Sequence, residues 1–177
     1  HPDGIAPEEE VANQANAATE AIWTVKEAFR TKALWLLIVG FTLANLSMGG
    51  FLLHRVPYWI EKGFEDNLVA FSMSADAVAF GLFIMLGGMI LDRFPARYVA
   101  GLATLLQAFA IVLTIIGQDT FGLFSSGILW GIGSGVSILV QIYIWAAYYG
   151  RAFLGSIRGL VLPIFLVAQG ISVPMIG

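Results

Sequence analysis

Asp76 is the residue with the clearest chemical potential in this sequence, because it is an acid inside a long apolar run, Leu68 to Leu91. A run of this length can cross the hydrocarbon core of a bilayer as a helix. An acid near the middle of such a helix costs at least ~2.5 kcal/mol on insertion scales. We therefore expect Asp76 to face a wet cavity or a partner, where it could bind and release a proton. The structural alternative is pairing with a neighbouring serine or backbone group near a helix end.

Other polar side chains interrupt the first apolar run at helical spacing. Thr42, Asn45 and Gly49 stand at i, i+3 and i+7, so they share one helix face. They could line a cavity, although hydrogen bonding between helices is the commoner use of such residues. His54 lies at the outer end of the same run and could titrate near physiological pH. An interfacial histidine without a role is the alternative.

The fourth apolar run carries small residues at close spacing. Gly127 and Gly131 stand at i and i+4, which lets another helix approach closely. Ser134 and Gln141 continue this face, so Gln141 could contact a solute. The stretch from Gly131 to Gly135 is not expected to bind a nucleotide, because no strand precedes it and it lies inside an apolar run.

The residue types present argue against several function classes. The chain has no cysteine and only two histidines, His1 and His54, which cannot form a metal site by themselves. No Walker motif and no cluster of nucleophile, base and orienting residue occurs. No basic patch is large enough for nucleic acid. We therefore expect no enzyme activity, no cofactor and no nucleic-acid partner.

Composition and periodicity give the fold class. Of the 177 residues 58% are hydrophobic and 12% charged, with a mean hydropathy of +0.82. Soluble domains average about 45–50% apolar residues and about 25% charged residues. The sequence predicts an all-α polytopic membrane protein of about five spans. The predicted spans cover residues 33–56, 68–91, 98–117, 121–145 and 159–177. Residues 1–22 are polar and are predicted to be a linker, with a capping box at Thr24 to Glu27 and a helix end or kink at Pro57.

The distribution of basic residues predicts the orientation. One side of the predicted topology carries Lys26, Arg30, Lys32, Arg93, Arg97, Arg151 and Arg158. The other side carries Arg55 and Lys62. Seven residues against two place the N-terminal flank in the cytoplasm of a cell (inner) membrane by the positive-inside rule.

The hairpin between the second and third runs carries a family resemblance. It reads G-x-x-x-D-R-x-x-x-R, with Gly88, Asp92, Arg93 and Arg97 at the fixed positions. This pattern resembles the loop signature of the major facilitator superfamily, although Pro95 and Ala96 replace its usual glycine and basic residue. The loop from Tyr149 to Gly159, with Arg151 and Arg158, is similar to one in bacterial relatives of oxalate/formate antiporters and monocarboxylate porters.

The resemblance implies a secondary transporter that works by alternating access. The family has twelve spans in two halves, and this chain resembles helices seven to eleven, without the N-terminal half. Asp92, Arg93 and Arg97 would form a cytoplasmic gate whose partner lies in that half; the alternative is that the arginines only fix topology. Carboxylate carriers of the resembled groups have basic residues inside the eighth or eleventh helix, and the runs at 68–91 and after Arg158 have none.

The expected function is movement of a small solute across the bilayer. The solute could be a small organic anion whose movement is coupled to that of a proton. Asp76, Asn45, Gln141, Thr42 and His54 are the candidate pathway residues. The alternative is a membrane scaffold or sensor that binds partner helices through the faces of Gly127 and Gly131.

Overall fold

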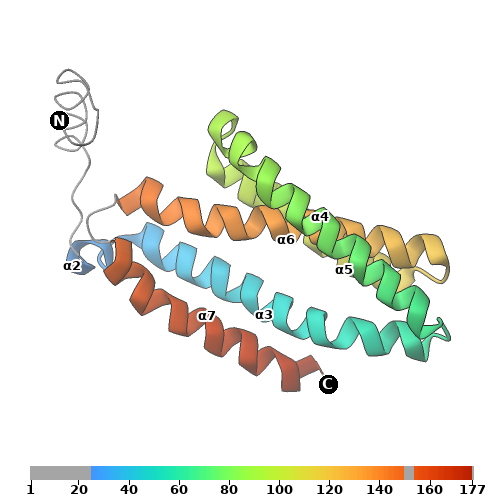
Figure 1. The fold of residues 1–177 in the computed structure, drawn as a ribbon. Helices are drawn as coiled ribbons and strands as arrows, with labels where there is room; N and C mark the ends of the chain where they lie inside the picture. The colour runs from blue at the N-terminus through green and yellow to red at the C-terminus, as the bar shows by residue number, and fades with distance from the viewer. Residues whose placement is uncertain (1–24, 150–153, 177) are drawn as a thin grey trace, which may run out of the picture.

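The structure, a computed structural model, describes residues 25–149 and 154–176, and this part of the chain is all helical (Figure 1). The helices are α2 (Val25–Ala28), α3 (Lys32–Glu61), α4 (Asp66–Arg93), α5 (Ala96–Ile116), α6 (Thr120–Tyr149) and α7 (Leu154–Ile176). Among the described residues, the five helices α3 to α7 are long and apolar enough to cross a membrane. The prediction of an all-α, multi-pass membrane protein is thereby confirmed.

The first long helix passes through its proline. The predicted end at Val56 is wrong, because α3 continues through Pro57 to Glu61. A proline removes one backbone donor, a loss that apolar membrane helices tolerate when other groups re-satisfy the freed carbonyl. The chain turns instead at Gly63, whose φ of +91° is a conformation that glycine adopts readily. This difference moves Arg55 from a helix end into the helix itself.

The helix starts also differ in detail from the predicted ones. The second span was predicted from residue 68, but α4 begins at Asp66, and Glu65 precedes it as the N-cap residue with extended backbone. Thr31 caps α3, where its Oγ1 accepts a hydrogen bond from Leu34 N at 3.4 Å. The capping box predicted at Thr24, the linker over residues 1–22 and Arg151 all lie outside the described residues.

The five long helices form two groups, and α6 is the centre of the larger one. Both α4 and α5 pack along α6, whereas α3 packs along α7 (Figure 1). The most apolar stretch of α6 is 56% buried, against 17–28% in the other four helices. Glycines allow this packing on two sides of α6: Gly131 and Gly135 face α4, and Gly133 faces α5. Their missing β-carbons let the backbones approach closely.

The second group is a helix pair with its own glycine contact. A β-carbon at Gly49 of α3 would overlap the side chains of Ser172 and Gln169 on α7. His54 Nε2 also lies 3.1 Å from the carbonyl oxygen of Val173, further along the same pair. Pro163 and Pro174 both lie inside α7, which continues past the first to Ile176.

Apolar clusters join the two groups near their ends. One cluster includes Leu34 and Ile38 of α3, Ile144 and Trp145 of α6, and Val161 of α7. The other joins Trp59 of α3 to Val69 of α4 and Leu123 of α6. At this second end, Lys62 Nζ also donates to the carbonyl oxygen of Gly117, at 2.7 Å, and so ties α3 to the end of α5. The groups are therefore fastened near both ends and less closely packed between them.

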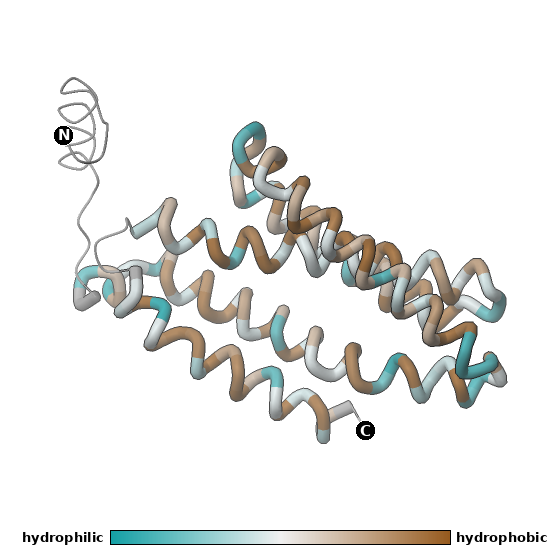
Figure 2. Tube along the Cα trace, in the orientation of Figure 1, coloured by the Kyte–Doolittle hydropathy of each residue, from teal (hydrophilic) through white to brown (hydrophobic). Residues whose placement is uncertain are grey.

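The outer faces of the helices are apolar. Large side chains such as Phe71 and Met85 are 68% and 77% exposed. Figure 2 shows apolar residues along most of the helix length, with hydrophilic residues gathered in the turns. Exposed apolar surface of this extent is costly in water, so these faces suit contact with lipid or other membrane helices.

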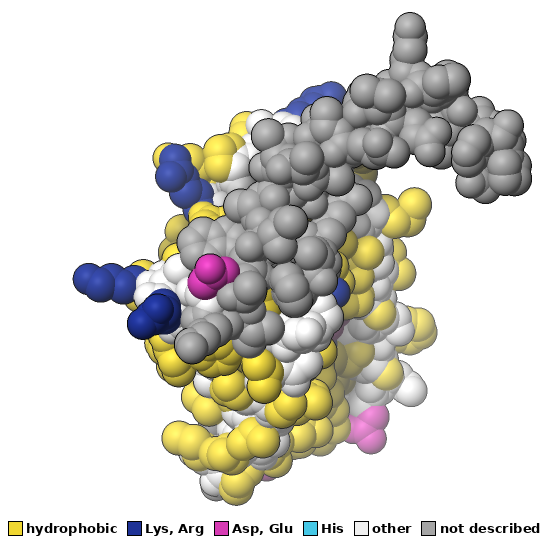
Figure 3. Space-filling view, turned by 90° about the vertical axis from the view of Figure 1, so that its left-hand side faces the viewer, with side chains coloured by type: hydrophobic (Ala, Val, Ile, Leu, Met, Phe, Trp, Pro, Cys, Tyr) yellow, Lys and Arg dark blue, Asp and Glu magenta, His cyan; other side chains and the backbone are white. Residues whose placement is uncertain are grey.

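Basic residues predominate at one end of the bundle and acidic residues at the other, although Asp92 also lies at the basic end. We call one end the basic end; it carries Arg30, Lys32, Arg93, Arg97 and Arg158, and Figure 3 shows it with several Lys and Arg side chains. We call the opposite end the acidic end; it carries Glu61, Glu65, Asp66 and Asp119, together with Lys62. Arg55 belongs to neither end, because it is buried in α3.

Candidate functional site

Three neighbouring cavities lie in the gap between α3 and the α5–α6 side of the larger group. The middle cavity, of about 600 Å³, lies between α3, α5 and α6. It shares Phe41, Ala44, Gln107 and Ser137 with a cavity of about 380 Å³ toward α7. It shares Ser47 and Ile111 with a cavity of about 460 Å³ toward the acidic end. Together they follow α3 from Arg158, near the basic end, to Glu61 at the acidic end.

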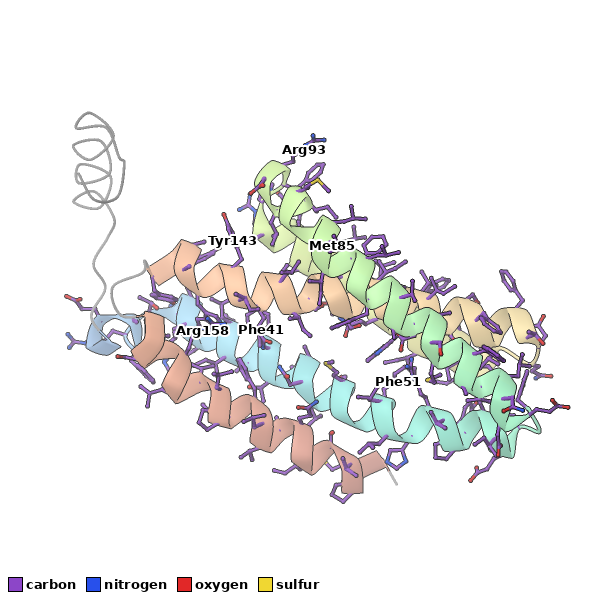
Figure 4. The ribbon with its side chains drawn as sticks, in the orientation of Figure 1. Phe41, Phe51, Met85, Arg93, Tyr143 and Arg158 are labelled. Atoms are coloured by element: carbon purple, nitrogen blue, oxygen red, sulfur yellow. The ribbon has the colours of Figure 1, made fainter. Side chains whose placement is uncertain are left out.

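We call the first of these the amide cavity, because four side-chain amides line it. They are Asn45 of α3, Gln107 of α5, Gln141 of α6 and Gln169 of α7. Its other lining residues include Phe41, Trp145 and Phe165, whose rings give it apolar walls. Phe41 and Arg158, which also lines the cavity, are labelled in Figure 4. Apolar walls with a few convergent polar groups are typical of small-molecule sites.

The amides differ in how firmly they are held. Gln107 is buried and its Nε2 donates to Gly133 O at 3.2 Å and to Ser137 Oγ at 2.6 Å, so it joins α5 to α6. Asn45 Nδ2 donates to Phe41 O within its own helix, at 2.8 Å. That bond uses the amide nitrogen and not the Oδ1 acceptor of Asn45. The cavity can thus offer both donors and acceptors to a polar solute.

We call the cavity toward the acidic end the arginine cavity. It is lined by Arg55 with Ser47, Phe51, His54, Tyr58, Thr114 and their apolar neighbours. Arg55 is 4% exposed, and its guanidinium carbon lies 5.6 Å from the centre of the Phe51 ring. That ring packs in turn against Trp130 of α6, with centroids 4.2 Å apart. Figure 4 labels Phe51 on α3, where that helix faces the larger group.

Arg55 forms an ion pair with Asp76 of α4. Nη2 of Arg55 donates to Oδ2 of Asp76, and the two side chains are only 3% and 12% exposed. The Nε and Nη1 atoms of Arg55 are buried without a hydrogen-bond partner among the described residues. The pair links the α3–α7 group to the α4–α5–α6 group, in a part of the bundle where both charges are withdrawn from water.

The glycines of α6 fix the position of Asp76. A β-carbon at Gly131 would lie 2.6 Å from Asp76 Oδ1, and one at Gly127 would lie 3.2 Å from Ser72 Oγ, one turn earlier on α4. Ser72 Oγ also donates to Leu123 O, at 3.2 Å. The close approach predicted from Gly127 and Gly131 is therefore made within the chain, and it seats the aspartate directly against α6.

The structure sorts the predicted pathway residues into different places. Asn45 and Gln141 line the same cavity. His54 lines the arginine cavity. Asp76 is not among the lining residues of that cavity but pairs with Arg55, which is. The structural alternative of a serine or backbone partner for Asp76 is replaced by an arginine. Thr42 is absent from the lining of these three cavities, and its Oγ1 is buried without a partner among the described residues.

The residues of the hairpin signature lie at the basic end. Only Phe94 and Pro95 separate α4 from α5, and Asp92, Arg93 and Arg97 are exposed there. Arg93 is labelled at this hairpin in Figure 4. A β-carbon at Gly88 would meet nothing within 4 Å, so within the described chain no contact requires a glycine at this position. Asp92 and Arg93 are exposed, and Arg97, which is also exposed, lines the middle cavity.

Two predicted positions need correction. Arg158 is not a loop residue: it lies in the second turn of α7, half-buried, and lines the amide cavity. Arg55 was counted with the charges of the outer side, but it is buried within α3, so it leaves that count. With α3 extended to Glu61, Lys62 alone remains as the basic residue of that side.

Two important residues were missed, and each had a signal in the sequence. Gln107 stands alone as an amide in the third apolar run, a position where a polar side chain needs a partner. Arg55 stands two residues before Pro57 and was assigned to the outer flank because the helix was expected to end or kink there. An arginine 21 residues before a buried aspartate could have been tested as its partner.

No protein-family model, no curated protein and no solved structure matches this chain. The resemblance to the major facilitator superfamily therefore rests on the hairpin and loop residues alone.

Proposed function

We propose that this chain is part of a secondary active transporter that moves a small solute across the membrane by alternating access. The observation that carries the proposal is the row of three cavities along α3, between two helix groups fastened near both ends. Alternating access needs two bodies that can move around a polar site near the membrane centre, and we propose that this chain is one body and an N-terminal half the other. The amide cavity is the proposed solute site, and its volume of about 380 Å³ lies in the range of ligand pockets.

The buried ion pair supports coupling to a proton. Charged side chains inside membrane helices are rare and mark ion pathways, proton relays and substrate sites. A protonated Asp76 would no longer hold Arg55, so proton binding would loosen a link between the two helix groups. We propose a small organic anion as the co-transported solute. Arg55 supplies the intramembrane cation that the predicted second and fifth runs lack.

The family, the missing half and the orientation belong to the same proposal. We propose that the chain corresponds to helices seven to eleven of a major facilitator transporter, and that an N-terminal half completes the cavity. The exposed Asp92, Arg93 and Arg97, together with the open surface at Gly88, would form the cytoplasmic gate against that half. The basic end would face the cytoplasm of a cell (inner) membrane.

The scaffold alternative has weaker support. It required Gly127 and Gly131 to receive a partner helix, and both glycines already face α4 of the same chain. A scaffold also has no need of polar cavities or of an ion pair inside the bundle. The apolar outer faces remain available to membrane partners under either function.

The test is transport by the full-length gene product in proteoliposomes. Lumenal pH would be followed while small carboxylates and neutral solutes are presented to the wild type, Asp76→Asn and Gln141→Leu. Gln118→Leu is the matched control, because Gln118 is an exposed amide in the α5–α6 turn. We expect solute-dependent proton movement in wild type and control, loss of coupling in Asp76→Asn, and weaker uptake in Gln141→Leu. No proton movement and no uptake for any solute would contradict transport.

A further inference from the structure

The ammonium group of Lys62 lies against the end of α5, although Lys62 itself follows the last turn of α3. Its Nζ donates to the carbonyl oxygens of Thr114, Ile115 and Gly117, at 3.3, 3.2 and 2.7 Å. An ammonium has three N–H donors, so it has one for each of these acceptors. Helix α5 has no basic residue in its own last turn. Lys62 therefore supplies, from another helix, the positive charge that stabilises a helix C-terminus.

Two aromatic rings near the end of α3 lie beside the same ammonium group. Nζ of Lys62 is 4.5 Å from the ring centre of Tyr58 and 5.0 Å from that of Trp59, within the range of cation–π attraction. The Tyr58 hydroxyl also donates to the carbonyl oxygen of Ile115, at 3.3 Å. We call these contacts of Lys62 and Tyr58 with the end of α5 the lysine latch.

The lysine latch lies at the border of the arginine cavity. Tyr58 and Glu61 of α3 line that cavity. Thr114 and Ile115 of α5 line it too, and their carbonyl groups accept hydrogen bonds from Lys62. Further toward the basic end the two helices are apart, because α3 packs along α7, α5 packs along α6, and the middle cavity lies between α3 and α5. The latch therefore joins two walls of the arginine cavity at the acidic end.

We propose that the lysine latch controls access to the arginine cavity from the acidic end. While Lys62 contacts α5, the gap between α3 and α5 is held narrow at this end; when Lys62 withdraws, the gap widens and the cavity opens. Lys62 is exposed, so water can replace the carbonyl groups as its acceptors. The apolar cluster around Trp59 still holds α3 to α4 and α6, so the movement is confined to the end of α5.

The latch lies within this chain, so its opening is separate from the movement of two halves in the proposed transport cycle. Opening needs neither a solute nor a gradient and can be measured without them. A failed test of the latch would leave the transport proposal in place, and a failure of transport would leave the latch in place.

The experiment measures how fast a thiol in the arginine cavity is modified in this chain, which has no cysteine of its own. Thr114→Cys is the reporter, because Thr114 is 4% exposed and lines the cavity. In lipid nanodiscs, a small, negatively charged methanethiosulfonate is applied to the reporter chain with and without Lys62→Met. We expect Lys62→Met to raise the labelling rate by about tenfold or more, since loss of charge-assisted hydrogen bonds shifts a local opening equilibrium by about that factor. The loss of a nearby positive charge would by itself slow this reagent, so a faster reaction reports opening.

Two controls separate opening at the acidic end from a general loosening of the bundle. Lys32→Met removes a lysine at the opposite end of α3 and should leave the labelling rate at Thr114→Cys unchanged. Ala44→Cys reports on the amide and middle cavities, and Lys62→Met should not change its labelling rate. Equal acceleration at both reporters would overturn the proposal, as would no acceleration at Thr114→Cys.

Lys62→Ala allows the latch to be closed again. n-Propylammonium chloride supplies the remainder of the lysine side chain that this variant lacks. We expect it to slow the labelling of Thr114→Cys, and sodium chloride at the same concentration to leave the fast rate. Fast labelling that neither salt changes would show that an ammonium group at the end of α5 does not close the gap. If neither Lys62 variant folds, Tyr58→Phe, which loses the hydroxyl bond to Ile115, should raise the labelling rate, and an unchanged rate would overturn the proposal.

Discussion

Arg55 and Asp76 stand 21 residues apart in the chain and meet between α3 and α4, with their side chains 3% and 12% exposed. The contact joins the α3–α7 pair to the α4–α5–α6 group at a level between the two apolar clusters that fasten the ends. Because this ion pair joins the two helix groups, a change in the charge of either side chain would change how closely the groups are held together.

The pair predicts non-additive effects on stability. Arg55→Gln or Asp76→Asn alone leaves one buried charge without its partner, which costs roughly 3–5 kcal/mol in buried pairs. The double variant removes both charges and should cost clearly less than the sum of the two. Thermal or denaturant unfolding in the same detergent would measure the cycle. Additive losses would mean that the two side chains do not act as a pair.

The reason that sequence reasoning missed this pair is local. Asp76 was predicted to face a wet cavity or a partner, and the structure gives it a partner, Arg55. Arg55 was not considered for this role because it was counted among the charges that flank the first span, whose end or kink was expected at Pro57. A proline specifies a missing donor and a fixed φ, not a helix end, and the apolar surroundings of α3 decide whether the helix continues. Helix α3 ends at Glu61, and the chain turns at Gly63, whose backbone has a positive φ.

Gly131 is predicted to be intolerant of any side chain. A β-carbon there would overlap the Asp76 backbone and lie 2.6 Å from its Oδ1, so Gly131→Ala must push α4 away from α6. We expect a loss of stability of roughly 1–3 kcal/mol, as for other overpacked cores. The same change would displace Asp76 relative to Arg55. Unfolding temperature and monodispersity in detergent are the measurements.

Gly81 supplies the matched control on α4, since a β-carbon there meets nothing within 4 Å. Gly81→Ala should be neutral or slightly stabilising, because alanine favours a helix over glycine by about 0.5–1 kcal/mol. Equal losses in Gly81→Ala and Gly131→Ala would show that the effect comes from helix propensity rather than from helix packing.

Two glutamines of one cavity should behave differently. Gln107→Leu removes donors from Gly133 O and Ser137 Oγ, so we expect it to lower stability by about 1–3 kcal/mol. Gln141 is only half-buried on the wall of the amide cavity, so Gln141→Leu should leave the unfolding temperature nearly unchanged. If the cavity binds solute, Gln141→Leu will instead weaken uptake. Loss of folding in Gln141→Leu would argue for a purely structural amide.

The site was partly predictable for a geometric reason. Asn45 and Gln141 were selected from helix faces, and both side chains line the amide cavity, although Thr42 and Gly131, on the same two faces, do not. The pattern within one helix cannot say which two helices share a gap, because every span here is apolar on most sides. His54 and Asn45 lie on the same helix, yet they line different cavities. Gln107 and Arg158 join the amide cavity only through the way that α5 and α7 pack.

The absence of cysteine from the sequence makes the orientation directly measurable. Single cysteines at Arg93, in the last turn of α4, and at Glu65, before its first turn, are both exposed and mark opposite ends of one helix. The positive-inside rule predicts that the basic end is cytoplasmic. In intact cells, a membrane-impermeant maleimide should label Glu65→Cys and spare Arg93→Cys. Both should react after the membrane is broken. Labelling of Arg93→Cys alone in intact cells would reverse the orientation, and with it the proposed cytoplasmic gate at Asp92.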